Sequence, residues 1–201
     1  DGSALAFWAD GRLQSFSFGS SKPTSLTALA IPPQGTDWLS QDTIYFASQG
    51  AIHRISSRGG APASVVEPPA DDTKTQYSHP ELVPESDLIL YTAHSRAEPR
   101  VEARRLSGGP PATLVENATF PKVVAGYLLF VRDGRLMAIA FDRSKLATSG
   151  QAIALEDNIG PTKNRGAANF DVADDGTFVA MASERVPQFR RVVGGAGEGK
   201  K

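Results

Sequence analysis

The sequence predicts an all-β protein built from repeated antiparallel units, and three observations support this. Short apolar runs alternate with turn signals, and the 201 residues include 19 glycines and 14 prolines. No segment shows sustained helical periodicity. One hairpin pattern recurs along the chain at intervals of roughly 40 residues, a period typical of repeat architectures.

The clearest copy of this hairpin lies in residues 127–141. Two apolar runs flank Asp133 and Gly134, a pair that accepts the positive φ angles of a tight hairpin turn. Four other hairpins align with it at the last residue of the first apolar run. These anchors are 39, 45, 39 and 50 residues apart: Phe7, Phe46, Tyr91, Phe130 and Ala180. The intervals match the length of a four-stranded β-propeller blade.

The remaining elements follow in the same order within each unit. Asp10-Gly11 and Gln49-Gly50 form the first two hairpin turns, whereas the third and fifth hairpins have longer loops at 95–99 and 184–187. Gly59-Gly60 and Gly108-Gly109 precede outer strands, because glycine supplies the unusual φ that such a turn needs. A short inner strand precedes each hairpin except the first. Each unit is therefore an inner strand, two hairpin strands and an outer strand.

The predicted domain organisation is one β-propeller over residues 1–193 and a flexible tail at 194–201. Its units span about 1–30, 35–68, 78–117, 119–157 and 167–193. A single four-stranded meander cannot bury both of its faces, so the units must stack around an axis. Because the first unit lacks an inner strand and the last lacks an outer one, we expect five units of a ring with six or more blades.

Composition excludes several classes of function. The net charge is −1, so no strong field attracts nucleic acid or an anionic membrane. The absence of cysteine excludes disulfides, Cys-based zinc sites and thiol catalysis. No apolar run is long enough to span a membrane. The chain begins at Asp1 without a leader, and we expect it to be a fragment.

Motifs that carry chemistry are few. Residues 194–200 match a phosphate-loop pattern, but Lys201 follows where a Ser or Thr would hold magnesium, which favours a solvated tail. The acidic turns lack the clustered oxygen ligands of a calcium loop, and Asp before Gly is what a hairpin needs. The three histidines lack zinc-site spacing: His53, His79 and His94. We therefore expect no metal and no cofactor.

The candidate binding residues are His79, Arg165 and Asn169, which we expect at the mouth of the central channel. His79 precedes an inner strand, and inner strands line that channel. The alternative for His79 is a hydrogen-bonded structural histidine. No Gly-x-Ser-x-Gly nucleophile motif occurs, so we expect no catalytic residues and no enzyme in this chain.

Two segments carry a family resemblance, namely residues 127–142 and 166–176. They resemble the TolB-like or WD40-like (PD40) β-propeller repeats of bacteria, most closely the propellers at the C-terminal ends of bacterial serine/threonine kinases. Ser78-His79-Pro80 is similar to the family's inner strand, although Pro84-Glu85-Ser86 departs from its usual turn. The resemblance implies a propeller without catalytic residues and a periplasmic or otherwise extracytoplasmic location.

These observations leave three functions open. The first is a non-catalytic binding or scaffold module that holds a protein or a small ligand at a propeller face or in the channel. The alternative is an accessory sensor or gating domain of a larger enzyme, a serine/threonine kinase or a peptidase. The third is a self-contained enzyme whose active site lies at the channel mouth, near His79, Arg165 and Asn169.

Overall fold

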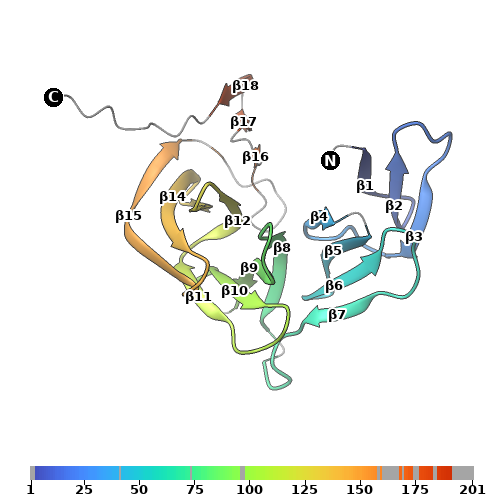
Figure 1. Ribbon diagram of the computed structural model, residues 1–201, viewed down its shortest axis with the longest axis horizontal. Helices are drawn as coiled ribbons and strands as arrows, with labels where there is room; N and C mark the ends of the chain where they lie inside the picture. Colours follow the sequence, from blue (N-terminus) through green and yellow to red (C-terminus); the bar gives the residue numbers. More distant parts are fainter. Residues whose placement is uncertain are drawn as a thin grey trace.

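A computed structural model describes residues 3–40, 42–72, 74–95, 98–157, 159, 168, 170–173, 177–182 and 185–191. Among these residues, every element of regular secondary structure is a β-strand, and the strands form five antiparallel sheets. Each sheet is made of strands that are consecutive in sequence, and Figure 1 shows the sheets following one another around an arc. The predicted class, an all-β propeller of antiparallel blades, is confirmed. We call the sheets blades 1 to 5 in chain order.

The blades differ in strand number. Blade 1 contains β1 (Ala4–Ala9), β2 (Arg12–Ser17) and β3 (Thr24–Ala28). Blade 2 contains β4 (Thr36–Ser40), β5 (Thr43–Ser48), β6 (Ala51–Ser56) and β7 (Ala63–Val66). Blade 3 contains β8 (Gln76–Leu82), β9 (Leu88–His94), β10 (Arg100–Arg105) and β11 (Ala112–Glu116). Blade 4 contains β12 (Thr119–Val124), β13 (Tyr127–Arg132), β14 (Arg135–Asp142) and β15 (Ala147–Glu156). Blade 5 contains β16 (Phe170–Val172), β17 (Thr177–Ala182) and β18 (Arg185–Arg191).

Tight turns hold the hairpins in register. Asp133 and Gly134, between β13 and β14, have φ angles of 52° and 72°. Two positive φ angles in a row give a turn whose twist matches that of the flanking strands. The Asp10-Gly11 turn has the same conformation, with φ angles of 52° and 71°. These aspartates therefore serve the backbone geometry of the turns, as the sequence predicts.

The hydrophobic core is divided among the joints between neighbouring blades. We call the joint between blades 1 and 2 joint 1/2, and name the others in the same way. Joint 1/2 buries Leu13, Leu26 and Phe46; joint 2/3 buries Tyr45, Ile52 and Tyr91; joint 3/4 buries Leu90, Leu128 and Phe130; joint 4/5 buries Leu129, Leu136 and Phe178. Successive residues of a strand face opposite sides, so β13 contributes Leu128 to one joint and Leu129 to the next. Each such side chain contributes about 1.5–3 kcal/mol when fully buried. Stability thus comes from stacking the blades.

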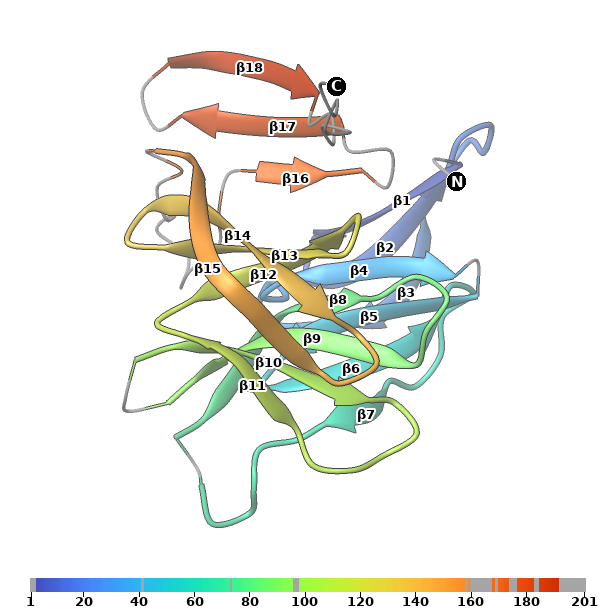
Figure 2. The ribbon, with the colours of Figure 1, turned by 60° about the vertical axis from the view of Figure 1, so that its left-hand side comes forward.

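The inner strands also touch one another in order around the arc. β4 contacts β8, β8 contacts β12, and β12 contacts β16. Figure 2 shows the strands of blade 5 stacked beside blade 4. None of the described residues belongs to a helix long and apolar enough to cross a membrane. The inner strands are therefore where side chains from distant parts of the sequence converge.

Candidate binding site at the inner strands

One charged residue occupies the same place in each of the four inner strands. In the strand register it pairs with the residue just before the apolar anchor of the hairpin. The four pairs are Asp37 with Tyr45, Glu81 with Leu90, Lys122 with Leu129, and Asp171 with Val179. We call Asp37, Glu81, Lys122 and Asp171 the inner positions. The repeat thus brings three acids and one lysine to equivalent places in successive blades.

Two of the inner positions bind the backbone of the next blade. A carboxylate oxygen of Asp37 accepts a hydrogen bond from the N–H of Leu82 at 2.5 Å. Oε1 of Glu81 accepts one from the N–H of Val123 at 3.2 Å. Leu82 and Val123 each directly follow an inner position. The same carboxylate-to-backbone contact therefore closes joint 2/3 and joint 3/4.

Lys122 changes this pattern, because an ammonium group can only donate hydrogen bonds. Its Nζ lies 2.9 Å from Oε2 of Glu81 and 3.2 Å from Oδ1 of Asp171. The N–H of Val172, which follows the inner position of blade 5, donates to Oδ1 of its own neighbour Asp171 at 3.0 Å. Lys122 thus links blade 4 to both adjacent blades through ion pairs.

Burial sets the electrostatics of these groups. It raises the pKa of Glu81 to about 7, against the opposing effect of Lys122, and it also raises the pKa of Asp37. Burial disfavours the charged form of Lys122, but Glu81, Asp171 and Asp37 together raise its pKa above the ordinary value. The side chain of Asp171 is 74% exposed, whereas that of Glu81 is 10% exposed. Asp171 is the inner position that a ligand reaches most easily.

His79 lies in β8 and is packed between blades rather than exposed. Its side chain is buried, and its ring packs against the ring of Phe120 of blade 4, with 5.0 Å between centroids and 51° between the ring planes. Ser78 Oγ bridges the Nδ1 of His79 at 2.9 Å and the Nε2 of His94 at 2.8 Å. Burial is the main cause that lowers the pKa of His79 to about 4, and His94 and Lys122 add to it. His79 is therefore neutral at pH 7, and the geometry matches the structural alternative weighed for it.

The other two predicted site residues, Arg165 and Asn169, lie outside the described residues. Their place at the channel stays a prediction, as does a ligand-binding role for His79. Sequence reasoning missed the inner positions altogether. A signal was present, because each of them precedes its hairpin anchor by eight to ten residues and is followed by an apolar residue. Aligning the units on the anchors would have found them.

Comparison with known proteins identifies the fold. No protein-family profile matches the sequence, and no curated protein matches it. TolB from Acinetobacter baumannii matches with a TM-score of 0.66 at 15% identity, over 92% of this chain and 48% of TolB. A puromycin-hydrolysing peptidase from Mycobacterium tuberculosis matches with a TM-score of 0.62 at 13% identity, over 94% and 43%. An oligogalacturonate lyase in complex with manganese gives 0.58 at 10%, over 89% and 52%. The chain spans about half the length of these proteins.

The sequence predicts that the chain is not an enzyme, because it has the repeats of a propeller and no catalytic motif. That prediction is wrong, because these features do not exclude an enzyme. A peptidase and a lyase share the fold, so the fold is used by enzymes as well as by non-enzymes. The physical reason is that inner strands gather residues from separate blades, such as Glu81 and Lys122. Catalytic groups assembled in this way leave no short motif in the sequence. At these identities the matches show the fold alone, and that fold is a β-propeller.

Proposed function

We propose that this chain is a binding module that holds a cationic group of a peptide or small ligand at its inner positions. The observation that carries the proposal is the excess of acids there, with three carboxylates around a single lysine. Glu81 and Asp37 are held by backbone N–H groups of the next blade, which leaves Asp171 as the accessible carboxylate. Lys122 and the N–H of Val172 both contact Oδ1 of Asp171, and we propose that Oδ2 of Asp171 binds the cationic group of the ligand.

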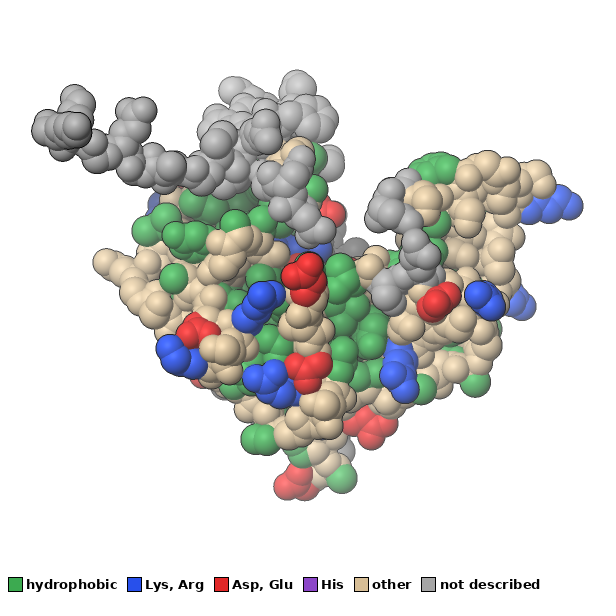
Figure 3. All heavy atoms as spheres, in the orientation of Figure 1, with side chains coloured by type: hydrophobic (Ala, Val, Ile, Leu, Met, Phe, Trp, Pro, Cys, Tyr) green, Lys and Arg blue, Asp and Glu red, His purple; other side chains and the backbone are tan. Residues whose placement is uncertain are grey.

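The fold and the surface charge support this proposal. Inner strands of a propeller converge on one axis, so a ligand there meets several blades at once. Figure 3 shows Lys, Arg, Asp and Glu side chains interspersed on the face viewed in Figure 1. A local acidic site, rather than a broad field of one sign, then determines which ligand group is preferred. Arg165 and Asn169 are proposed to add contacts to the same ligand.

The test is titration of the chain with short peptides that carry arginine or lysine, compared with the same peptides after the basic residue is replaced by glutamine. We expect binding only of the basic peptides, and a loss of affinity of about tenfold in Asp171→Asn, since an exposed ion pair contributes at most about 1 kcal/mol and a hydrogen bond to a charged group somewhat more. Asp157→Asn is the matched control, because Asp157 is a 63% exposed acid that pairs with Arg135. Equal binding by both variants would refute the proposal.

A second proposal is that the propeller senses or gates for an enzyme domain in a longer protein, a serine/threonine kinase or a peptidase. The match to the peptidase supports it, because it covers 94% of this chain and 43% of that protein. Activity of the full-length protein, measured with wild-type and Asp171→Asn propellers, tests it. We expect the substitution to change substrate selection, and unchanged selection would count against a gating role.

A further inference from the structure

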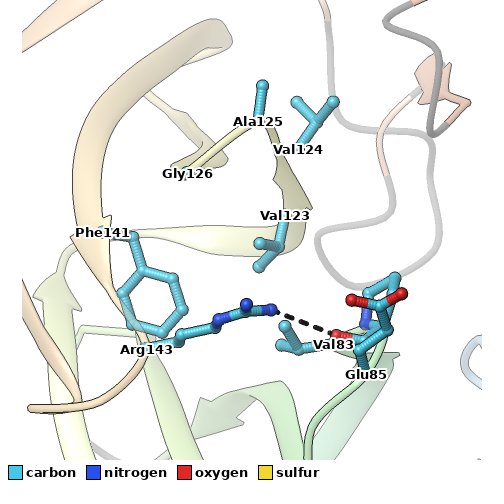
Figure 4. A pocket seen from close by; sticks show the side chains of 9 residues that line it. Val83, Glu85, Val123, Val124, Ala125, Gly126, Phe141 and Arg143 are labelled. Atoms are coloured by element: carbon cyan, nitrogen blue, oxygen red, sulfur yellow. Dashed lines mark hydrogen bonds between the residues drawn. The ribbon is translucent and has the colours of Figure 1, made fainter.

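A pocket lies at joint 3/4, and none of the four inner positions lines it. It has a volume of about 550 Å³, within the range of small-molecule sites. Three turns form it: the β8–β9 turn, the β12–β13 turn at Ala125 and Gly126, and the β14–β15 turn at Arg143. Figure 4 shows the side chain of Arg143 extending across it from the β14 side toward Val83 and Glu85.

The walls of this pocket are largely apolar. Val83 and Phe141 belong to the core of joint 3/4, and Val123 packs against that core from β12. In Figure 4 the ring of Phe141 lies on the opposite side of the pocket from Val83. Burying an apolar group against such walls is favourable because it removes apolar surface from water. The pocket therefore suits an aliphatic or aromatic group.

Two charged side chains of opposite sign line the same pocket and do not pair with each other. The Nη1 of Arg143 donates one long hydrogen bond, 3.3 Å, to the carbonyl oxygen of Pro84. Within the described part of the chain, no carboxylate forms an ion pair with Arg143, whereas Arg105 and Arg135 each have an aspartate partner. Glu85, in the facing turn, is exposed and also forms no ion pair with a described residue. A guanidinium fork and a carboxylate are thus both open to a ligand.

We propose that this pocket binds a small zwitterion with an apolar side group, either an apolar amino acid or a short apolar peptide. The ligand carboxylate lies on the guanidinium of Arg143, which matches its two oxygens with parallel donors. The ligand ammonium group lies on Glu85. The apolar side group packs between Val83, Val123 and Phe141. This site is separate from the inner positions, so the inference does not depend on the proposed function.

The first test compares ligands that differ by one charge. L-leucine and L-leucyl-L-leucine are titrated against the chain, together with 4-methylpentanoate, which lacks the amine, and 3-methylbutylamine, which lacks the carboxylate. We expect one of the two zwitterions to bind at least about tenfold more tightly than either singly charged analogue, because each analogue lacks one charge-assisted hydrogen bond; tenfold corresponds to about 1.4 kcal/mol. The two zwitterions separate an amino-acid site from a peptide site.

The second test uses variants at exposed positions, which leave the fold intact. Arg143→Gln weakens binding of the zwitterion and of 4-methylpentanoate alike, whereas Glu85→Gln weakens binding of the zwitterion and of 3-methylbutylamine but not of 4-methylpentanoate. Arg135→Gln, a control at an exposed arginine of the same blade, leaves both unchanged. Asp171→Asn also leaves them unchanged, which distinguishes this pocket from the inner positions. The proposal is overturned if neither zwitterion binds at millimolar concentration. It is also overturned if Glu85→Gln strengthens binding of 4-methylpentanoate and leaves binding of leucine unaffected.

Discussion

Joint 2/3 and joint 3/4 use the same repeated device in two different surroundings. In joint 2/3 the carboxylate of Asp37 binds a backbone N–H, and no described cation lies within ion-pair distance of it. In joint 3/4 the carboxylate of Glu81 binds a backbone N–H and also the ammonium group of Lys122. The first joint is closed by backbone contacts, and the second depends on a buried ion pair.

The two joints also differ in how closely their backbones approach. In joint 2/3 the N–H of His79 donates to the carbonyl of Gln34 at 2.7 Å, and a Cβ added at Gly35 would lie 2.7 Å from the Cα of His79. In joint 3/4 the rings of His79 and Phe120 lie against each other with 5.0 Å between centroids, and a 550 Å³ pocket lies between Val83 of blade 3 and Phe141 of blade 4. Two successive joints built from the same repeat therefore differ in how much room they leave between the blades.

The largest effect should come from breaking the close approach in joint 2/3. Gly35→Ala adds a methyl group that meets backbone at 2.7 Å, in a residue whose φ is 101°. We expect a loss of about 3 kcal/mol in the free energy of unfolding, measured by urea denaturation. Gly108→Ala is the control, because Gly108 has a φ of 114° with no atom within 4 Å of an added Cβ. Equal losses in both variants would show that φ alone, and not the contact, limits this position.

The ion pair of joint 3/4 is the next target. Lys122→Met leaves the carboxylate of Glu81 buried without its cation, and we expect a loss of about 3 kcal/mol at pH 8. The loss should shrink toward pH 5, because Glu81 then takes up a proton. Lys145→Met, at a 77% exposed lysine paired with Asp142, should leave urea denaturation unchanged. A pH-independent loss in Lys122→Met would contradict the role given to Glu81.

Two side chains of β8, His79 and Glu81, change the free energy of unfolding in opposite directions as the pH rises. The folded-state pKa of His79 is lowered from 6.5 to about 4, so its contribution is present above pH 6.5 and is lost as the pH falls toward 4. The folded-state pKa of Glu81 is raised from 4.5 to about 7, so its contribution is present below pH 4.5 and is lost as the pH rises toward 7.

Removing the histidine should expose the contribution of Glu81. We expect His79→Asn, in which Asn tolerates the φ of 50°, to lose about 2 kcal/mol relative to wild type as the pH rises from about 4.5 to 6.5. Thermal melts across this range provide the measurement. Parallel curves for the two proteins would mean that His79 titrates normally in the folded chain.

The smallest effect should come from neutralising the acid of joint 2/3. Asp37→Asn keeps an oxygen that accepts from the N–H of Leu82, and burial already disfavours the charge of Asp37. We expect a change of no more than about 0.5 kcal/mol at pH 7. Glu81→Gln should cost more, about 2 kcal/mol, because it leaves the ammonium of Lys122 with less compensation. Similar costs for the two variants would remove the distinction between the joints.

The sequence predicted the repeat because its signals are local. The Asp133-Gly134 turn and the alternation of Leu128 and Leu129 depend on residues a few positions apart. The inner positions depend on contacts between residues about 40 positions apart, such as Glu81 and Lys122, and neither residue carries a motif by itself. His79 was singled out for its place before an inner strand, but burial against Phe120 is a property of the neighbouring blade. The pocket at joint 3/4 requires three turns together and could not be predicted from any one of them.

The contact between an inner carboxylate and the next blade has a consequence for how such chains can grow. The acceptor is a side-chain carboxylate of one blade, and the donor is a backbone N–H of the next blade, at Leu82 or Val123. Any residue except proline would supply the same N–H at these two positions. A carboxylate of this kind does not require a particular side chain in its neighbour. For this one contact, a duplicated blade therefore needs no compensating substitution in its predecessor, and only the packing of the joint has to adapt.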